Sequence, residues 1–100
     1  MIPVPIKVRY HGFDYSQICR GDRSCLYRQT YQGKTMGFEV FIITNQPETI
    51  LNGIFYPAHE RWPKDEDFGK TAWSFFYLEE ASNKMKQLET IFSDISGKSI

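Results

Sequence analysis

The sequence has few cysteines, no long apolar run and no surplus of charge of either sign. Its longest apolar stretch falls far short of the ~20 residues that a transmembrane helix needs, so we expect no membrane span. Twelve basic and twelve acidic side chains give a net charge of zero. This balance removes the simplest electrostatic argument for binding to nucleic acid or to an anionic membrane surface.

Signals for export are also missing. Met1–Ile6 has no basic segment followed by a long apolar one, and the chain contains no Asn-x-Ser/Thr acceptor for glycosylation. The only cysteines are Cys19 and Cys25, and so few are typical of a reduced cytoplasmic protein. We therefore expect a cytoplasmic location and free thiols, with a secreted fragment as the alternative. A turn at 21–23 would place the two cysteines opposite each other across a hairpin.

The longest apolar stretch, Phe38–Thr44, predicts the central strand of the fold. It is rich in β-branched and aromatic residues, and both of its alternating faces are largely apolar. Such a strand belongs inside a sheet that is covered on both sides. Hydrophobic residues make up 41% of the chain, which is enough for a core in one domain over residues 1–100.

Patterns on either side of this stretch predict an antiparallel meander. Ile6, Val8 and Tyr10 alternate with polar residues, as in a half-buried strand. Further strands are expected at 13–19, 24–31, 37–44 and 71–76, with turn residues between the first three of these. Proline and glycine interrupt residues 45–70, which predicts an irregular connection with one helical turn at 47–51.

Apolar residues near the C-terminus recur at intervals of three or four, which predicts an amphipathic helix. The stripe consists of Leu78, Ala81, Met85, Leu88, Ile91, Phe92 and Ile95. We expect the helix to pack across one face of the sheet. The predicted fold is therefore α+β, with an antiparallel sheet of four to five strands and one C-terminal helix. A coiled-coil dimer seam is the less favoured interpretation of the stripe, because it spans fewer than three full heptads.

No motif in the sequence predicts catalysis, a cofactor or a metal. Gly-Lys-Thr occurs at 33–35 and 69–71, but the upstream glycine of a phosphate-binding loop is missing from both copies. The spacing of the histidines and cysteines matches no zinc module. Nothing fixes two candidate catalytic groups within hydrogen-bond reach of each other. We therefore predict a protein that is not an enzyme and that has no cofactor and no metal.

The leading functional prediction is a protein-interaction module, with a homodimer as one form of it. Aromatic residues are 16% of the chain, so an exposed apolar patch is expected. The predicted interface combines a sheet face with the aromatics of the long connection and the strand after it: Tyr27, Tyr31, Tyr56, Trp62 and Trp73. On this hypothesis Trp62→Ala weakens partner binding with little loss of stability.

The alternative function is that of an accessory protein that binds single-stranded nucleic acid. Basic residues alternate with tyrosines along the predicted meander, and this pattern is typical of a surface that holds phosphates and stacks bases. The basic residues concerned are Arg20, Arg23, Arg28 and Lys34. The zero net charge disfavours this alternative.

Four segments together resemble small uncharacterised proteins encoded by bacteriophages and mobile elements of gut bacteria. They are Phe38–Ile43, Tyr56-Pro57, Phe68–Lys70 with Ala72–Phe75, and Leu78–Ala81. The resemblance covers a little under half the chain, and none of the segments is a catalytic signature. It implies an intracellular accessory protein with no established activity.

Overall fold

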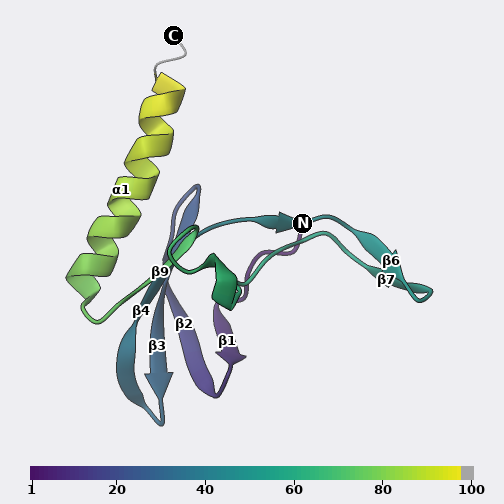
Figure 1. Ribbon diagram of the computed structural model, residues 1–100, viewed down its shortest axis with the longest axis horizontal. Coiled ribbons are helices and arrows are strands. Elements are labelled where there is room, and N and C mark those ends of the chain that lie inside the picture. Colours follow the sequence, from purple (N-terminus) through teal and green to yellow (C-terminus); the bar gives the residue numbers. More distant parts are fainter. Residues whose placement is uncertain (98–100) are drawn as a thin grey trace.

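A five-stranded antiparallel sheet forms the middle of the structure, with β4 inside it (Figure 1). The computed structural model describes the backbone of residues 1–97 and the side chains of residues 1–91. The order of the strands is β1 (Lys7–Tyr10), β2 (Phe13–Arg20), β3 (Ser24–Tyr31), β4 (Lys34–Ile42) and β9 (Ala72–Phe75). The predicted meander and the α+β fold class are therefore confirmed.

Two hairpins of this sheet turn through residue pairs with positive φ. His11 and Gly12 have φ angles of 52° and 83°, and Gln32 and Gly33 have φ angles of 50° and 80°. Two consecutive residues in this region form the mirror-image turn whose twist matches that of the paired strands. Glycine adopts this conformation without a steric penalty. These turns fix the β1–β2 and β3–β4 hairpins.

The helix α1 (Leu78–Gly97) packs on one face of the sheet, against β3, β4 and β9. The cluster between them consists of Leu26, Phe38 and Val40 from the sheet and Ala81, Met85 and Leu88 from the helix. The predicted apolar stripe is thus confirmed for Ala81, Met85 and Leu88. Leu78 and Ile91 are 39% and 46% exposed, and the side chains of Phe92 and Ile95 lie outside the described residues. The last turns of α1 extend past the sheet (Figure 1).

The opposite face is covered by the N-terminal residues and by the segment 61–71, which contains the short 3₁₀ helix η1 (Asp65–Asp67). Trp62 lies at the centre of this cover. Its ring contacts those of Tyr15, Tyr27 and Phe41 edge-on, with centroid distances of 5.1, 4.8 and 5.3 Å. Both faces of β4 are therefore covered, as its apolar pattern predicts.

Residues 45–60 form a hairpin arm, which corrects the prediction of a helical turn at 47–51. The base of the arm is the pair β5 (Asn45–Gln46) and β8 (His59–Glu60), and its outer part is the pair β6 (Thr49–Leu51) and β7 (Ile54–Tyr56). Asn52 and Gly53 form its turn, with φ angles of 54° and 78°. An Asn-Gly turn between apolar runs closes a hairpin and leaves no room for a helix.

The arm projects to one side of the molecule, away from α1 (Figure 1). It makes the molecule less compact than usual. The radius of gyration is 15.1 Å, whereas a globular chain of this length has about 13 Å.

One carboxylate fastens the base of the arm to the sheet. The two oxygens of Glu60 accept hydrogen bonds from the two terminal nitrogens of Arg20, both at 2.6 Å. One of these oxygens also accepts the Val4 N–H at 3.0 Å. The guanidinium lowers the pKa of Glu60. This paired contact is the strong form of a charge-assisted hydrogen bond, and it holds the N-terminus, β2 and β8 together.

Replacing Trp62 with alanine should lower the free energy of unfolding by about 2–4 kcal/mol, because a ring in contact with three other rings leaves a cavity behind. Urea denaturation followed by circular dichroism measures the change. Phe76→Ala is the matched control, since Phe76 is 83% exposed between β9 and α1 and its loss should change stability by less than about 0.5 kcal/mol. Unchanged stability of Trp62→Ala would show that this ring is not part of the core.

Candidate functional site

The five aromatic residues predicted to form one interface do not share a surface. Tyr27 is fully buried, donates its hydroxyl hydrogen to the carbonyl of Pro5 at 2.5 Å and accepts a hydrogen bond from Gln17 at 3.0 Å. Trp62 is partly buried in the same cluster. The prediction of an exposed sheet face at Tyr27 is therefore wrong, because the segment 61–71 folds back and covers that face.

The other three aromatics lie in separate places. Trp73 packs on the helix side of the sheet, where the Lys84 ammonium lies 4.1 Å from its ring centroid. Tyr31 is 46% exposed at the end of β3, and Tyr56 belongs to the arm. Only Tyr31 and Tyr56 are therefore exposed residues of the predicted set, and they sit on different elements.

The four basic residues of the nucleic-acid hypothesis are also divided between surfaces. Arg20 is paired with Glu60 at the base of the arm, and Arg28 lies over the ring of Phe38 on the helix side, 5.8 Å from its centroid. Arg23 is in the β2–β3 turn and Lys34 begins β4. The predicted single basic surface is not formed, because Arg20 and Arg28 lie on opposite faces of the sheet.

The outer part of the arm exposes five large apolar side chains. It consists of Ile50, Leu51, Ile54, Phe55 and Tyr56, whose exposed fractions are 72, 60, 56, 58 and 43%. Ile50 pairs with Phe55 and Leu51 pairs with Ile54, so both faces of the hairpin are apolar. Residues 49–56 carry no charged side chain. A two-stranded hairpin is marginal in water by itself, so such an arm favours contact with another surface.

The sequence contains the signal for this arm, although a helical turn was the structure predicted there. Asn52-Gly53 stands between two short apolar runs, which is the strongest short-range pattern for a hairpin. Proline and glycine around it favoured a loop. The prediction therefore missed four candidate contact residues that this pattern indicates: Ile50, Leu51, Ile54 and Phe55.

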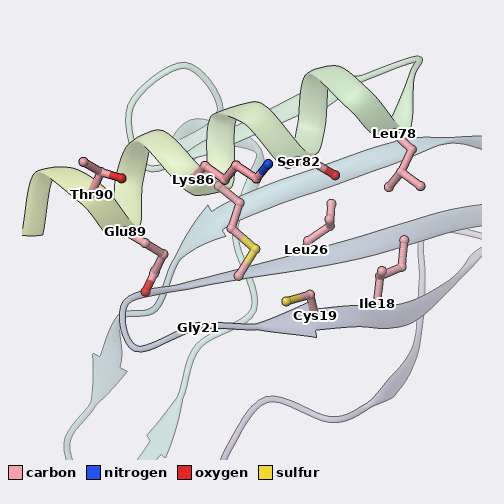
Figure 2. Close-up of a pocket in the computed structure, with 10 residues that line it drawn as sticks. Ile18, Cys19, Gly21, Leu26, Leu78, Ser82, Lys86, Glu89 and Thr90 are labelled. Carbon is pink, nitrogen blue, oxygen red and sulfur yellow. The ribbon is translucent and has the colours of Figure 1, made fainter. Parts of the chain in front are cut away.

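A groove runs between α1 and β2, with a volume of about 500 Å³ (Figure 2). It exists because α1 covers β3, β4 and β9, which leaves β2 uncovered on this face. Leu26 and Met85 are its buried apolar residues, while Ile18 and Leu78 are about 40% exposed at its sides. Ile18 and Cys19 both face the helix (Figure 2).

The bulge in β2 explains how consecutive residues face the same groove. The pairing with β3 shifts between Gln17 and Cys19, so Ile18 is the extra residue. The same shift places Arg20 rather than Cys19 opposite Cys25. The predicted opposition of the two cysteines is therefore wrong. Both thiols are free, and burial raises the pKa of Cys25 to about 11.

Glu89 of α1 closes one end of the groove and holds the helix to the β2–β3 turn. Its carboxylate accepts the Asp22 N–H at 2.8 Å, the Arg23 N–H at 3.1 Å and the Ser24 hydroxyl at 2.6 Å. Burial raises the pKa of Glu89, but these hydrogen bonds outweigh it and the pKa is lowered overall. A Cβ on Gly21 would lie 2.6 Å from the carboxylate, so a larger residue there would displace the Glu89 side chain.

Glu39 is a buried carboxyl on the opposite face, beside the Trp62 cluster. It is 8% exposed and accepts a long hydrogen bond of 3.4 Å from the Tyr15 hydroxyl. That hydroxyl in turn accepts a hydrogen bond of 2.8 Å from Gln29. Burial raises the pKa of Glu39 from 4.5 to about 7. Glu39 has no ion-pair partner among residues 1–91.

Within the described residues, no group of three or more His, Cys, Asp or Glu side chains is placed to hold a metal ion. None of the helices in that part of the chain has the length and apolar character that crossing a membrane requires.

No protein-family model matches the chain, and no curated protein or solved structure matches it either. The resemblance to proteins of bacteriophages and mobile elements stays a prediction.

Removing the Glu89 carboxylate should loosen α1 from the sheet. We expect Glu89→Ala to lower the free energy of unfolding by about 1–2 kcal/mol, because two backbone N–H groups and one hydroxyl lose their acceptor. Thermal and urea denaturation measure the loss. Glu80→Ala, an exposed glutamate in the first turn of the same helix, is the control and should cost less than about 0.5 kcal/mol. An equal loss in both variants would contradict this role of Glu89.

The pKa of Glu39 predicts an unusual pH dependence of stability. Between pH 4.5 and about 7 the unfolded chain loses this proton while the folded chain keeps it, so stability should fall as pH rises, by about 3 kcal/mol in full. Glu39→Gln should remove this fall and be the more stable protein at pH 8. Urea denaturation of both proteins at pH 4, 6 and 8 measures it. Parallel stability curves would show that Glu39 does not titrate in this range.

Proposed function

We propose that this protein is a non-enzymatic interaction module that associates with a second copy of itself through the β6–β7 arm. The observation that carries the proposal is the arm itself, with five large apolar side chains 43–72% exposed on a projecting hairpin. Exposed apolar patches of this kind mark interfaces. The outer part of the arm, residues 49–56, carries no charge and offers no ionic contacts, so it needs an apolar counterpart.

The chain itself provides such a counterpart in the groove between α1 and β2. Ile18, Leu26 and Met85 supply its apolar surface. The arm points away from α1 in its own molecule (Figure 1), so it reaches a groove only on another copy. Two copies that exchange arms around a twofold axis satisfy both surfaces at once, and a closed pair of this kind is the commonest form of homo-oligomer.

The area available is of the size that a stable dimer needs. An aromatic side chain buries about 150–250 Å² when it is fully covered, and leucine or isoleucine buries somewhat less. The five side chains of the arm are 43–72% exposed, so they offer roughly 500 Å². In a reciprocal exchange each copy contributes an arm and a groove, which brings the total near the ~800 Å² per partner of a standard interface.

A cytoplasmic location is part of the proposal, since both cysteines are free thiols, as is usual in a reducing compartment. Single-stranded nucleic acid is the less favoured partner, because the basic residues predicted for it lie on opposite faces and one of them is paired with Glu60. Salt dependence separates the two functions: phosphate binding weakens steeply with salt, and apolar association does not.

Light scattering behind a sizing column tests the self-association at several protein concentrations. The wild type should show twice the chain mass of 11.8 kDa at both 50 and 500 mM salt. Ile50→Glu should give the monomer mass, because a charge on the arm cannot enter an apolar groove. Ile6→Glu is the matched control: Ile6 is 68% exposed and lies on neither surface. A wild type that is monomeric at 100 µM would overturn the proposal of self-association.

Mixing two variants tests whether arm and groove meet. Ile18→Glu alters the groove and leaves the arm intact, so by itself it should also be monomeric. A mixture of Ile18→Glu with Ile50→Glu retains one intact arm and one intact groove, and it should recover a weak dimer. Circular dichroism checks that each variant is folded. Failure of the mixture to associate, with both variants folded, would show that the arm binds elsewhere.

A further inference from the structure

A second cavity lies on the face of the sheet opposite α1, where the segment 61–71 leaves part of the strands uncovered. Its volume is about 190 Å³. Five of the residues that line it are aromatic: Tyr10, Phe13, Tyr15, Trp62 and Phe68. The rings of Tyr10 and Tyr15 stand at 62° and 65° to that of Trp62, so the aromatic walls are not parallel and enclose the space from several sides.

The charged side chains that line this cavity, Glu39 and Asp65, are both acidic. Glu39 lines it from β4 and Asp65 lines it from η1, and no lysine or arginine is among its lining residues. The faces of aromatic rings also carry negative electrostatic potential. The cavity therefore attracts a cation and repels an anion, although the whole chain has no net charge.

Glu39 is the group in the cavity that we expect the cation to contact. A carboxyl that is 8% exposed and has one long hydrogen bond from Tyr15 is poorly compensated in its ionised form. Burial of a charge is costly unless an opposite charge accompanies it. Since the described part of the chain provides no such charge at Glu39, a ligand that brings a positive group into the cavity would supply it.

The size of the cavity limits the ligand. A volume of 190 Å³ is room for about six water molecules at ~30 Å³ each, and so for a group of about five or six non-hydrogen atoms. A metal ion would lack ligands, because only two carboxylates and one imidazole line the space and they are not grouped for one. Aromatic walls with a carboxylate are the surroundings that alkylated ammonium groups prefer.

We propose that this cavity binds an alkylammonium head group, held by cation–π contacts with Tyr15 and Trp62 and by the carboxylate of Glu39. The same head group occurs on free quaternary amines and on methylated lysine side chains. The site is separate from the arm and the groove, so it stands or falls independently of the self-association proposed above.

Tryptophan fluorescence provides a direct measurement, because Trp62 lines the cavity and the only other tryptophan, Trp73, lies on the opposite face. In a Trp73→Phe background, choline should change the Trp62 emission with a dissociation constant on the order of 1 mM. The isosteric alcohol, in which carbon replaces the quaternary nitrogen, should not bind. Equal binding of this uncharged analogue would overturn the proposal.

Variants assign the affinity to particular groups. Glu39→Gln keeps the size of the side chain and the acceptor for Tyr15 but removes the charge, and it should weaken choline binding about tenfold or more. Glu48→Gln, at an exposed position of the arm between β5 and β6, is the matched control and should bind as the wild type does. Asp65→Asn should have a smaller effect, because Asp65 is exposed at the rim. Unchanged affinity of Glu39→Gln would overturn the role of the carboxylate.

The pH dependence gives a readout that a merely structural role of Glu39 would not move. Binding should strengthen between pH 6 and 8 as Glu39 ionises, and it should release a proton that calorimetry detects as a buffer-dependent heat. The other titratable groups that face the cavity are His11, Asp65, Tyr10 and Tyr15. His11→Asn removes the imidazole at a position with φ of 52°, which asparagine tolerates. Loss of the proton release in His11→Asn but not in Glu39→Gln would overturn the assignment.

Trimethyllysine in a short peptide distinguishes the two sources of the head group. Binding at least tenfold tighter than choline would identify a protein side chain as the ligand. Equal or weaker binding would identify a free amine. Either result supports the alkylammonium site, whereas failure of both ligands to bind would overturn it.

Discussion

The need to cover both faces of β4 shapes the rest of this structure. Val40 and Phe41 are consecutive residues with exposed fractions of 0 and 1%, so each face of the strand must be shielded from water. The amphipathic helix α1 covers one face, and this covering layer is only one helix wide. No α-helix of the described residues covers the other face, so the chain after β8 folds back and places Trp62 against Tyr15, Tyr27 and Phe41. The remaining features of the molecule follow from this arrangement.

A single helix cannot cover five strands. α1 packs on β3, β4 and β9, and the groove beside it is the uncovered part of that face. The segment 61–71 is also too short to cover its face, and the cavity with Glu39 is what it leaves. To bring this segment to the sheet, the chain must leave β4 and return, and the arm is the path that it takes. Incomplete coverage thus creates the candidate sites, with burial energy as the common cause.

Three carboxylates show how charge is placed in a protein with no net charge. Glu60 and Glu89 are held by hydrogen-bond donors, and the pKa of each is lowered. They join parts that are far apart in sequence: the base of the arm to β2, and α1 to the β2–β3 turn. Glu39 accepts only one long hydrogen bond, from Tyr15, and burial raises its pKa to about 7. Glu60 and Glu89 have structural roles, whereas Glu39 is the carboxyl for which we propose a ligand.

The sequence by itself determined the strands of the five-stranded sheet, the helix and the α+β class, because the spacing of apolar residues records which side of each element is buried. It also contained the Asn52-Gly53 hairpin signal, although neighbouring proline and glycine hid it. Only the tertiary structure decided which aromatics are exposed: Tyr27 and Trp62 look like surface residues in the sequence and are core partners in the fold. The bulge at Ile18, which separates the two cysteines, was likewise invisible. Local patterns specify local geometry, whereas long-range packing depends on which segments fold back onto which face.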